Sequence, residues 1–413
     1  MTLFALLSVI VCLAALFGLV SNRFLRLPPT IGTLALSVVA VSILTVLGKH
    51  LPGIQDFATK LVQSIDFNAI VLHGMLAFLL FAGALHLDLG RLKKQAFPVA
   101  ALSVVGTILA TLFVAGLLWL ILHLCRMAAD VPTCLIFGAL ISPTDPVAVL
   151  EMLRRVKAPA EVQTLLGGES LFNDGVGAVL FLALLEASGP HGMPSLSRFS
   201  ILFLLEAGGG LALGLIAGYA VSRLIRLSDD YTLRTLLTLA LAMGGYALAD
   251  ALHLSAPLEA VAAGLMVSYR AHAVSTPVRQ EVADFWALLD DMLNVVLFLL
   301  LGFAMILVPF STRLFVAGLL TIPAVLLARA ASVAVVLFPL RRYVDRFGAL
   351  CAVLTWGGLR GALSVALVLT LAHRAGAIEL LSITYTVVVF SVLAQGLTMV
   401  PLLRRLGYAR TQV

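Results

Sequence analysis

Apolar residues fill this chain in repeated runs of about 20 residues, the length of helix that crosses a bilayer. A helix satisfies its backbone hydrogen bonds within one segment, so the pattern predicts an all-α polytopic membrane protein. We expect residues 1–413 to form one membrane unit of about 13 spans. The expected spans are residues 3–21, 30–48, 68–87, 98–125, 131–153, 162–186, 199–225, 232–252, 256–272, 283–308, 313–338, 349–373 and 379–403.

Composition agrees with a membrane protein. Apolar residues make up 61% of the chain and charged residues only 12%, with a mean hydropathy of +1.10. Soluble domains carry about 25% charged residues. The first run follows no basic residue and precedes no small-residue cleavage site, so we interpret it as a retained helix. The cysteines lack metal-ligand spacing and are expected to be core residues; they are Cys12, Cys125, Cys134 and Cys351.

Lysine and arginine are concentrated in alternate loops. One set of loops holds 19 of the 27 basic residues and the other holds 6, while Arg329 and Arg360 lie inside spans. Cytoplasmic loops carry the excess of Lys and Arg, and the alternation fits only an odd number of spans. We therefore expect an inner (plasma) membrane protein with its N-terminus outside and its C-terminus in the cytoplasm. The net charge of +6 then reflects topology, and no nucleic-acid partner is expected.

Two spans are interrupted by residues that a continuous helix avoids. Residues 142–146 of the fifth span read Ser-Pro-Thr-Asp-Pro, and each proline removes a backbone donor. Residues 355–361 of the twelfth span read Thr-Trp-Gly-Gly-Leu-Arg-Gly. Interrupted spans at matching positions in two halves indicate an inverted repeat with a site near the midplane. We therefore predict two inverted six-helix repeats joined by span 199–225.

The sixth span holds residues 168–175, Gly-Glu-Ser-Leu-Phe-Asn-Asp-Gly, with two carboxylates in an apolar setting. A charge near the bilayer centre costs about 2.5–3.5 kcal/mol, so a retained charge indicates a function. Asp174 is the first candidate, because Ser170 lies four residues earlier on the same helix face. Together they offer oxygen ligands for a hard monovalent cation, and a buried carboxylate can bind a proton instead. The alternative is a packing carboxylate tied to the hydroxyl.

Asp145 is the second candidate. It lies between two prolines, where backbone carbonyls, especially that of Thr144, are freed to coordinate a cation. The nearby helix ends would help to neutralise charge there. The alternative is an N-cap aspartate for the helix after Pro146, which leaves a role at the site open.

Glu169 and Arg360 are expected to form a structural ion pair, because either charge alone would be costly inside a membrane. The alternative is that Arg360 acts as a movable counter-charge to Asp174. Arg329 has no obvious partner in the sequence. Asn173 adds hydrogen-bonding groups without charge, so the sixth span offers one titrating carboxylate at its centre. One proton per cation would make transport electroneutral.

Three separated motifs resemble those of cation/proton antiporters of the NhaP and eukaryotic NHE type. The motifs are residues 142–146, 168–175 and 357–361 (Gly-Gly-Leu-Arg-Gly). Leu27-Pro28-Pro29 and Leu79-Leu80-Phe81 are similar as well, so the resemblance covers essentially the whole chain. One position departs, because some relatives carry an acidic residue after the Leu-Leu-Phe element, where this chain has Ala82 and then Gly83.

The resemblance implies a homodimer whose core crosses at two unwound helices and moves like an elevator against a dimerisation domain. Asp174 is implied to be shared by cation and proton, with Thr144 and Ser170 as oxygen ligands. Asn173 beside Asp174 is implied to mark electroneutral exchange. The core is expected to take, in part, spans 68–87, 98–125, 131–153, 162–186, 313–338, 349–373 and 379–403. The dimerisation domain is expected to take, in part, spans 3–21, 30–48, 199–225, 232–252, 256–272 and 283–308.

We therefore predict a secondary transporter, not an enzyme, that exchanges Na⁺ or Li⁺ for H⁺ and serves pH homeostasis without a cofactor. The cation would be held by Asp174, Ser170, Thr144 and Asp145. Alternatives are a K⁺/H⁺ antiporter or another cation-coupled inverted-repeat carrier. An anion carrier would need cationic ligands at its centre. An intramembrane protease would need a Gly-Xaa-Gly-Asp element, which is missing before Asp174.

Competition at Asp174 is the expected mechanism. Protonation releases the cation, and the empty charged site is the state least able to cross a low-dielectric barrier. This predicts a bell-shaped pH dependence whose alkaline limit moves with cation concentration.

Overall fold

The computed structural model describes residues 3–48, 69–128, 130–188, 196–271, 276–309, 311–341, 346–371 and 376–408. Residues 68, 272, 372 and 373, at the ends of expected spans, lie outside the described residues. So do five of the basic residues behind the orientation argument, namely Lys49, Lys60, Arg342, Arg374 and Arg410. Within the described ranges the chain is helical and contains no β-sheet, which confirms the predicted fold class.

Every expected span has a helical counterpart. The first half of the chain forms α1 (Leu3–Val20), α2 (Pro29–Gly48), α4 (Leu76–His86), α5 (Leu89–Lys94), α6 (Ala96–Ala101), α7 (Thr107–Leu124), α8 (Val131–Ile141), α9 (Val147–Arg155), α10 (Ala160–Ala187) and α11 (Leu196–Ile225). The second half forms α12 (Tyr231–Ala251), α13 (Ala256–Ala271), α14 (Thr276–Phe303), α15 (Thr312–Leu337), α16 (Phe347–Gly357), α17 (Ala362–Leu369), α18 (Ala377–Phe390) and α19 (Gly396–Arg405). Wider π-helical stretches at Leu102–Gly106 and Ser391–Gln395 join helices within spans, and another at Ala69–Met75 leads into α4.

Some spans are single long helices and others are interrupted. Nine helical segments within the described ranges are long and apolar enough to cross a bilayer. Spans 131–153 and 349–373 are each split into two short helices, α8 with α9 and α16 with α17, as the prolines and glycines predict. The split leaves extended backbone at two points deep in the protein.

α10 occupies the middle of the molecule and α11 its outside. In its most apolar stretch, 61% of α10 is buried against the rest of the chain, compared with 17% for α11. Small residues allow neighbours to approach α10 closely, since a Cβ at Gly177 would overlap the Pro143 ring. The candidate residues on α10 are therefore surrounded by protein, whereas α11 presents apolar side chains outward.

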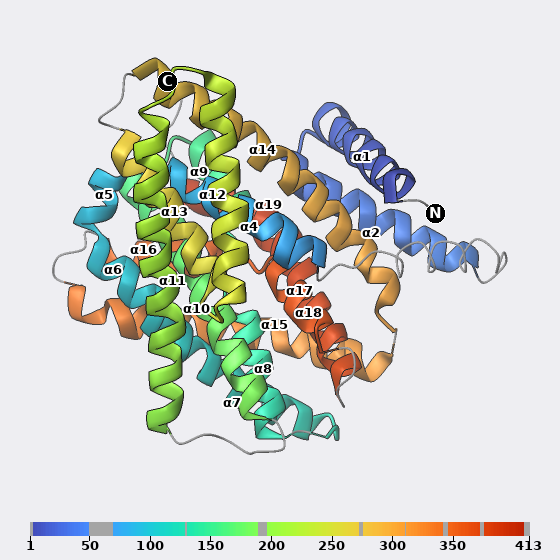
Figure 1. The fold of residues 1–413 in the computed structure, drawn as a ribbon. Helices are drawn as coiled ribbons and strands as arrows, with labels where there is room; N and C mark the ends of the chain where they lie inside the picture. The colour runs from blue at the N-terminus through green and yellow to red at the C-terminus, as the bar shows by residue number, and fades with distance from the viewer. Residues whose placement is uncertain are drawn as a thin grey trace.

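The third span packs mainly on helices outside the group in which the sequence placed it, although α4 also contacts α10. α4 lies mainly against α13 and α14, and α14 in turn packs on α2. Figure 1 shows α1 and α2 at one edge, with α14 running obliquely between them and the upright pair α11 and α12. α15 instead packs on α7, α16 and α18. α10 lies between these two groups, with contacts to both α8 and α13.

Candidate cation site

The two broken spans meet where both are unwound. The Asp145 N–H donates to the Leu359 carbonyl at 2.8 Å, which forms an isolated antiparallel bridge. Gly361 permits this approach, because a Cβ there would overlap the Asp145 carboxylate. The interruptions predicted from prolines and glycines therefore lie against each other.

Arg360 satisfies the carbonyls that the first break sets free. Its Nη1 donates to the Pro143 carbonyl at 3.0 Å and also to the Ser142 carbonyl. Its backbone N–H donates to Ser391 Oγ at 2.9 Å, and that hydroxyl donates to Gln395 Oε1 at 2.6 Å. The side chain is buried at the negative C-terminal end of α8, which favours a cation. Arg360 thus ties the two breaks together.

Glu169 pairs with Arg329, so the expected Glu169–Arg360 pair is wrong. Arg329 Nη1 and Nη2 donate to the two Glu169 carboxylate oxygens at 2.7 and 2.6 Å. Glu169 is 0% exposed and Arg329 is 2% exposed, and Arg329 also donates to the Leu354 carbonyl. The physical reason is that the freed carbonyls compete for Arg360. In the described part of the chain, Arg360 makes no ion pair with Asp174 either.

Asn173 links this ion pair to the broken fifth span. Its Oδ1 accepts from the Thr144 N–H at 3.1 Å, and its Nδ2 donates to Thr144 Oγ1 at 2.8 Å and Glu169 Oε1 at 2.9 Å. The Thr144 and Ser170 hydroxyls lie 2.9 Å apart. All four residues are at most 1% exposed, and we call them the buried cluster. Only an amide accepts and donates in this way, so Asn173 contributes bonds as well as an absence of charge.

Asp174 and Asp145 line a cavity of about 250 Å³ between α10, the crossing and helices α2, α4 and α14. The Asp174 carboxylate makes no hydrogen bond or ion pair with the described residues. Asp145 Oδ1 accepts from the N–H of Val147 at 2.9 Å and so ties down the start of α9. The N-cap residue of α9 is Pro146, so Asp145 is not the N-cap that the alternative expected. The predicted site residues therefore lie in two places. The carboxylates of Asp145 and Asp174 line the cavity, whereas the side chains of Thr144, Ser170 and Asn173 belong to the buried cluster.

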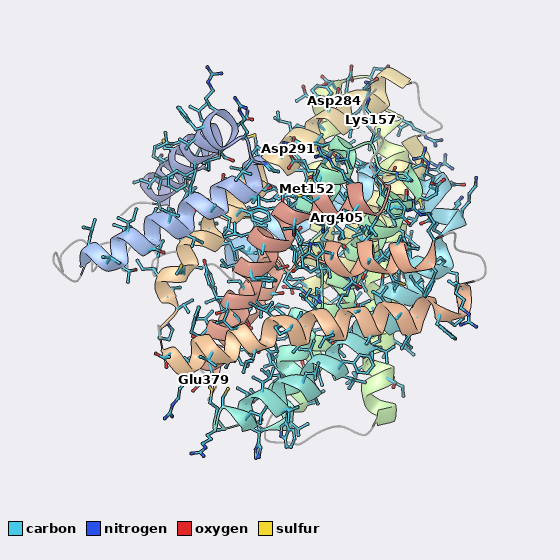
Figure 2. All side chains as sticks on the ribbon, turned by 180° about the vertical axis from the view of Figure 1, so that it is seen from behind. Met152, Lys157, Asp284, Asp291, Glu379 and Arg405 are labelled. Atoms are coloured by element: carbon cyan, nitrogen blue, oxygen red, sulfur yellow. The ribbon has the colours of Figure 1, made fainter. Side chains whose placement is uncertain are left out.

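The cavity extends toward one end of the molecule. Its lining includes charged or titratable residues at the end of α4 and in the second half of α9, namely His86, Glu151 and Arg154. Figure 2 shows Lys157, Asp284 and Asp291 toward this end and Glu379 toward the opposite one. This is the end that carries the basic segment 154–157.

Two further features were missed or left open by the sequence. Ala82 is 0% exposed and does not line the cavity. The α4 part of the cavity wall contains no acidic group and is made by Leu76, Leu79, Leu80, Gly83 and His86. Arg329 was the missed member of the site. Its signal was present, because an intramembrane arginine needs an acidic partner, and Glu169, which the sequence analysis paired with Arg360, could pair with either arginine.

Comparison with known proteins gives the family. The family model described as sodium/hydrogen exchanger, transmembrane, matches residues 9–405. The chain belongs to the sodium/hydrogen exchanger family. This confirms the resemblance found in the three motifs.

Relatives of this exchanger family match over nearly the full chain. The Na⁺/H⁺ antiporter NhaP of Pseudomonas aeruginosa is 40% identical over 97% of this chain and 96% of its own. The Na⁺/H⁺ antiporter NhaH of Halobacillus dabanensis is 32% identical over 90% and 92%. Among solved structures, the sodium proton antiporter MjNhaP1 of Methanocaldococcus jannaschii at pH 8 aligns with a TM-score of 0.77 over 98% of this chain and 99% of its own. At 22% identity it shows a shared fold.

Proposed function

We propose that this exchanger-family protein is a secondary antiporter that moves Na⁺ or Li⁺ in exchange for H⁺, with Asp174 as the shared site. One observation carries the proposal. The Asp174 carboxylate has no protein partner in the described residues and lines a cavity beside two crossing, broken helices. A carboxylate is costly in such a setting unless it binds a proton or a cation. The Na⁺/H⁺ antiporter names of full-length relatives support the same interpretation.

In this proposal the cation is held by the Asp174 and Asp145 carboxylates from the cavity side. Thr144 and Ser170 add hydroxyl oxygens from the buried cluster. Because these two hydroxyls are 2.9 Å apart and bonded to each other, they must turn toward the ion when it binds. The hydrogen bond from the Thr144 N–H to Asn173 Oδ1 involves the backbone and would hold that segment in place during the change.

Exchange follows from competition for one carboxylate. When Asp174 takes a proton it loses the charge that holds the cation, and when it binds a cation it gives the proton up. Asn173 adds no second charge on α10, and Asp145 keeps its charge throughout the proposed cycle, so one proton leaves for each cation that binds and the cycle is electroneutral. Membrane voltage then does not drive the exchange, and only the concentration gradients of the cation and of the proton set its direction.

Alternating access is proposed to be an elevator movement between two groups of helices. One group contains α8, α9 and α15 to α17, and the other contains α2, α13 and α14. We place α4 in the second group, because α13 and α14 are its main neighbours. With the N-terminus outside, the cavity end marked by Arg154 faces the cytoplasm and the state is inward-facing. The second group would form the homodimer.

The test is cation-driven proton movement in everted membrane vesicles. We expect Na⁺ or Li⁺ to collapse a preset pH gradient with the native protein and to have no effect with D174N. E161Q is the matched control, because Glu161 is an exposed carboxylate in the first turn of the same helix. Unchanged exchange by D174N would refute the assignment. Running K⁺ in parallel, with and without a collapsed membrane potential, separates K⁺ antiport and electrogenic exchange from the proposal.

A further inference from the structure

A second set of oxygen atoms lines the same cavity, outside the proposed exchange site. Asp290 and Asn294 lie four residues apart on one face of α14, and Thr30 lies in the first turn of α2. Ser364 comes from α17, just past the crossing. These four residues lie on helices other than α10, which carries Asp174.

Three of these residues hold an oxygen that has no partner. Asn294 Oδ1, Thr30 Oγ1 and Ser364 Oγ are buried and make no hydrogen bond with the described residues. Asn294 is 2% exposed, Thr30 is 6% and Ser364 is 1%. A buried polar atom without a partner costs free energy, so three in the wall of one cavity indicate a ligand that the protein alone does not supply.

The Asn294 amide is oriented so that its oxygen is left free. Its Nδ2 donates to the Asp290 carbonyl at 2.9 Å and to Asp290 Oδ1 at 3.1 Å. Two acceptors around one amide group fix which end is nitrogen. Oδ1 is then the remaining acceptor, on the helix face that it shares with the Asp290 carboxylate.

The chemistry of this set selects a small hard cation. It offers one carboxylate, one amide oxygen and two hydroxyl oxygens, and no sulfur or imidazole ligand. Hard cations prefer oxygen ligands of this kind. A single negative charge balances a monovalent ion without leaving net charge. The other charged groups in the cavity wall are Asp291, Glu151 and Arg154, together with the exchange-site carboxylates.

We propose that Asp290, Asn294, Thr30 and Ser364 form a second monovalent-cation position, which receives the ion before it reaches Asp174. The inference rests on the proposed antiport function, because it assigns a step on the path to that site. The position is built from α2 and α14 on one side and α17 on the other. Movement between these helices would change its geometry and release the ion.

Binding of radioactive Na⁺ to purified protein tests the position without transport. D174N disables the exchange site, so Na⁺ bound by D174N reports on the second position. We expect D174N to retain saturable Na⁺ binding that is weakened at least tenfold in D174N/D290N. An absence of saturable binding to D174N, or equal binding by the two variants, would overturn the proposal. The proposed function can fail separately, when native protein binds Na⁺ but moves no protons.

Transport kinetics give a second test. D290N should raise the Na⁺ concentration for half-maximal exchange about tenfold and keep the maximal rate. S364A should raise it about threefold, and it removes no protein hydrogen bond of the described residues, so the fold is retained. D291N is the matched control, because Asp291 is a neighbouring, exposed carboxylate that lines the same cavity. An equal shift in D290N and D291N that vanishes at high salt would mean a general negative potential and would overturn the site.

Discussion

Two carboxylates five residues apart on α10 have opposite surroundings. Glu169 is fully buried, and its oxygens accept from Arg329 and Asn173. Asp174 has no such partner in the described residues and lines the cavity. The helix and the chemical class are the same, so the neighbours separate a carboxylate that holds the structure together from one that is available to an ion.

The neighbours differ because α10 lies between two groups of helices. One turn of α10 faces α15, which supplies Arg329, and the Glu169 carbonyl is also bonded by Ser103 Oγ at 3.0 Å. Farther along, the helix faces the gap toward α14 and α2, where the cavity lies. The comparison predicts that changes at Glu169 act on stability and changes at Asp174 act on ion binding. Four experiments on the unfolding free energy can break or sharpen it.

Removing Arg329 should have the largest effect. R329A leaves the Glu169 carboxylate buried without its cation, and breaking a buried pair in this way costs about 3–5 kcal/mol. We expect a clearly lower unfolding temperature for the detergent-purified protein. The double variant E169Q/R329M removes both charges and should recover at least half of the loss. A loss below about 1 kcal/mol for R329A would show that the pair contributes little.

Na⁺ should stabilise the native protein by binding to the carboxylates that line the cavity. A ligand at 100 times its Kd adds about 2.7 kcal/mol to the folded state. Protons compete for the same carboxylate, so the Na⁺-induced rise in unfolding temperature should be larger at alkaline than at acid pH. D174N should lose the part that depends on pH. Choline chloride at equal ionic strength is the control, and a rise that is the same at every pH would contradict competition.

An aspartate at position 173 should be destabilising by an intermediate amount. N173D replaces the amide that donates to Glu169 at 2.9 Å with a group that cannot donate and that repels the carboxylate. We expect a loss of about 1–3 kcal/mol. N173A removes the two bonds that Nδ2 donates and also the bond that Oδ1 accepts from the Thr144 N–H, but it adds no charge, so it should cost less if repulsion dominates. If N173A costs more, repulsion between the two carboxylates is not the main cause of the loss in N173D.

Sequence reasoning predicted the spans, the two breaks and Asp174 as the carboxylate offered to an ion. It did not predict the partner of Glu169. Apolar runs and prolines act locally, so residues 142–146 identify their own break. The partner of Glu169 lies 160 residues away, and three intramembrane charges allow more than one pairing. Which arginine pairs with Glu169 depends on which arginine donates to the freed Ser142 and Pro143 carbonyls. That is decided only where the two broken spans cross in the folded protein.

The sequence also did not predict the hydrogen bonds within the buried cluster or which helices pack around the cavity. Asn173 is visible as an uncharged neighbour of Asp174, but its bonds to Thr144 require α10 to lie against the break. The grouping of α4 with α13 and α14 depends on packing between spans that are far apart in the chain. Ordinary apolar helices carry no sequence signal that distinguishes one apolar neighbour from another.

The smallest expected effect is the sharpest test of the comparison. D174N and E169Q make the same chemical change, carboxylate to amide, on one helix. D174N breaks no hydrogen bond of the described residues, so its unfolding free energy without Na⁺ should stay within about 0.5 kcal/mol of the native value. E169Q leaves Arg329 buried without its counter-charge and should lower the unfolding temperature measurably. If D174N in Na⁺-free buffer is destabilised as much as E169Q, Asp174 is also part of the structural network, and the two carboxylates do not differ in the way their surroundings indicate.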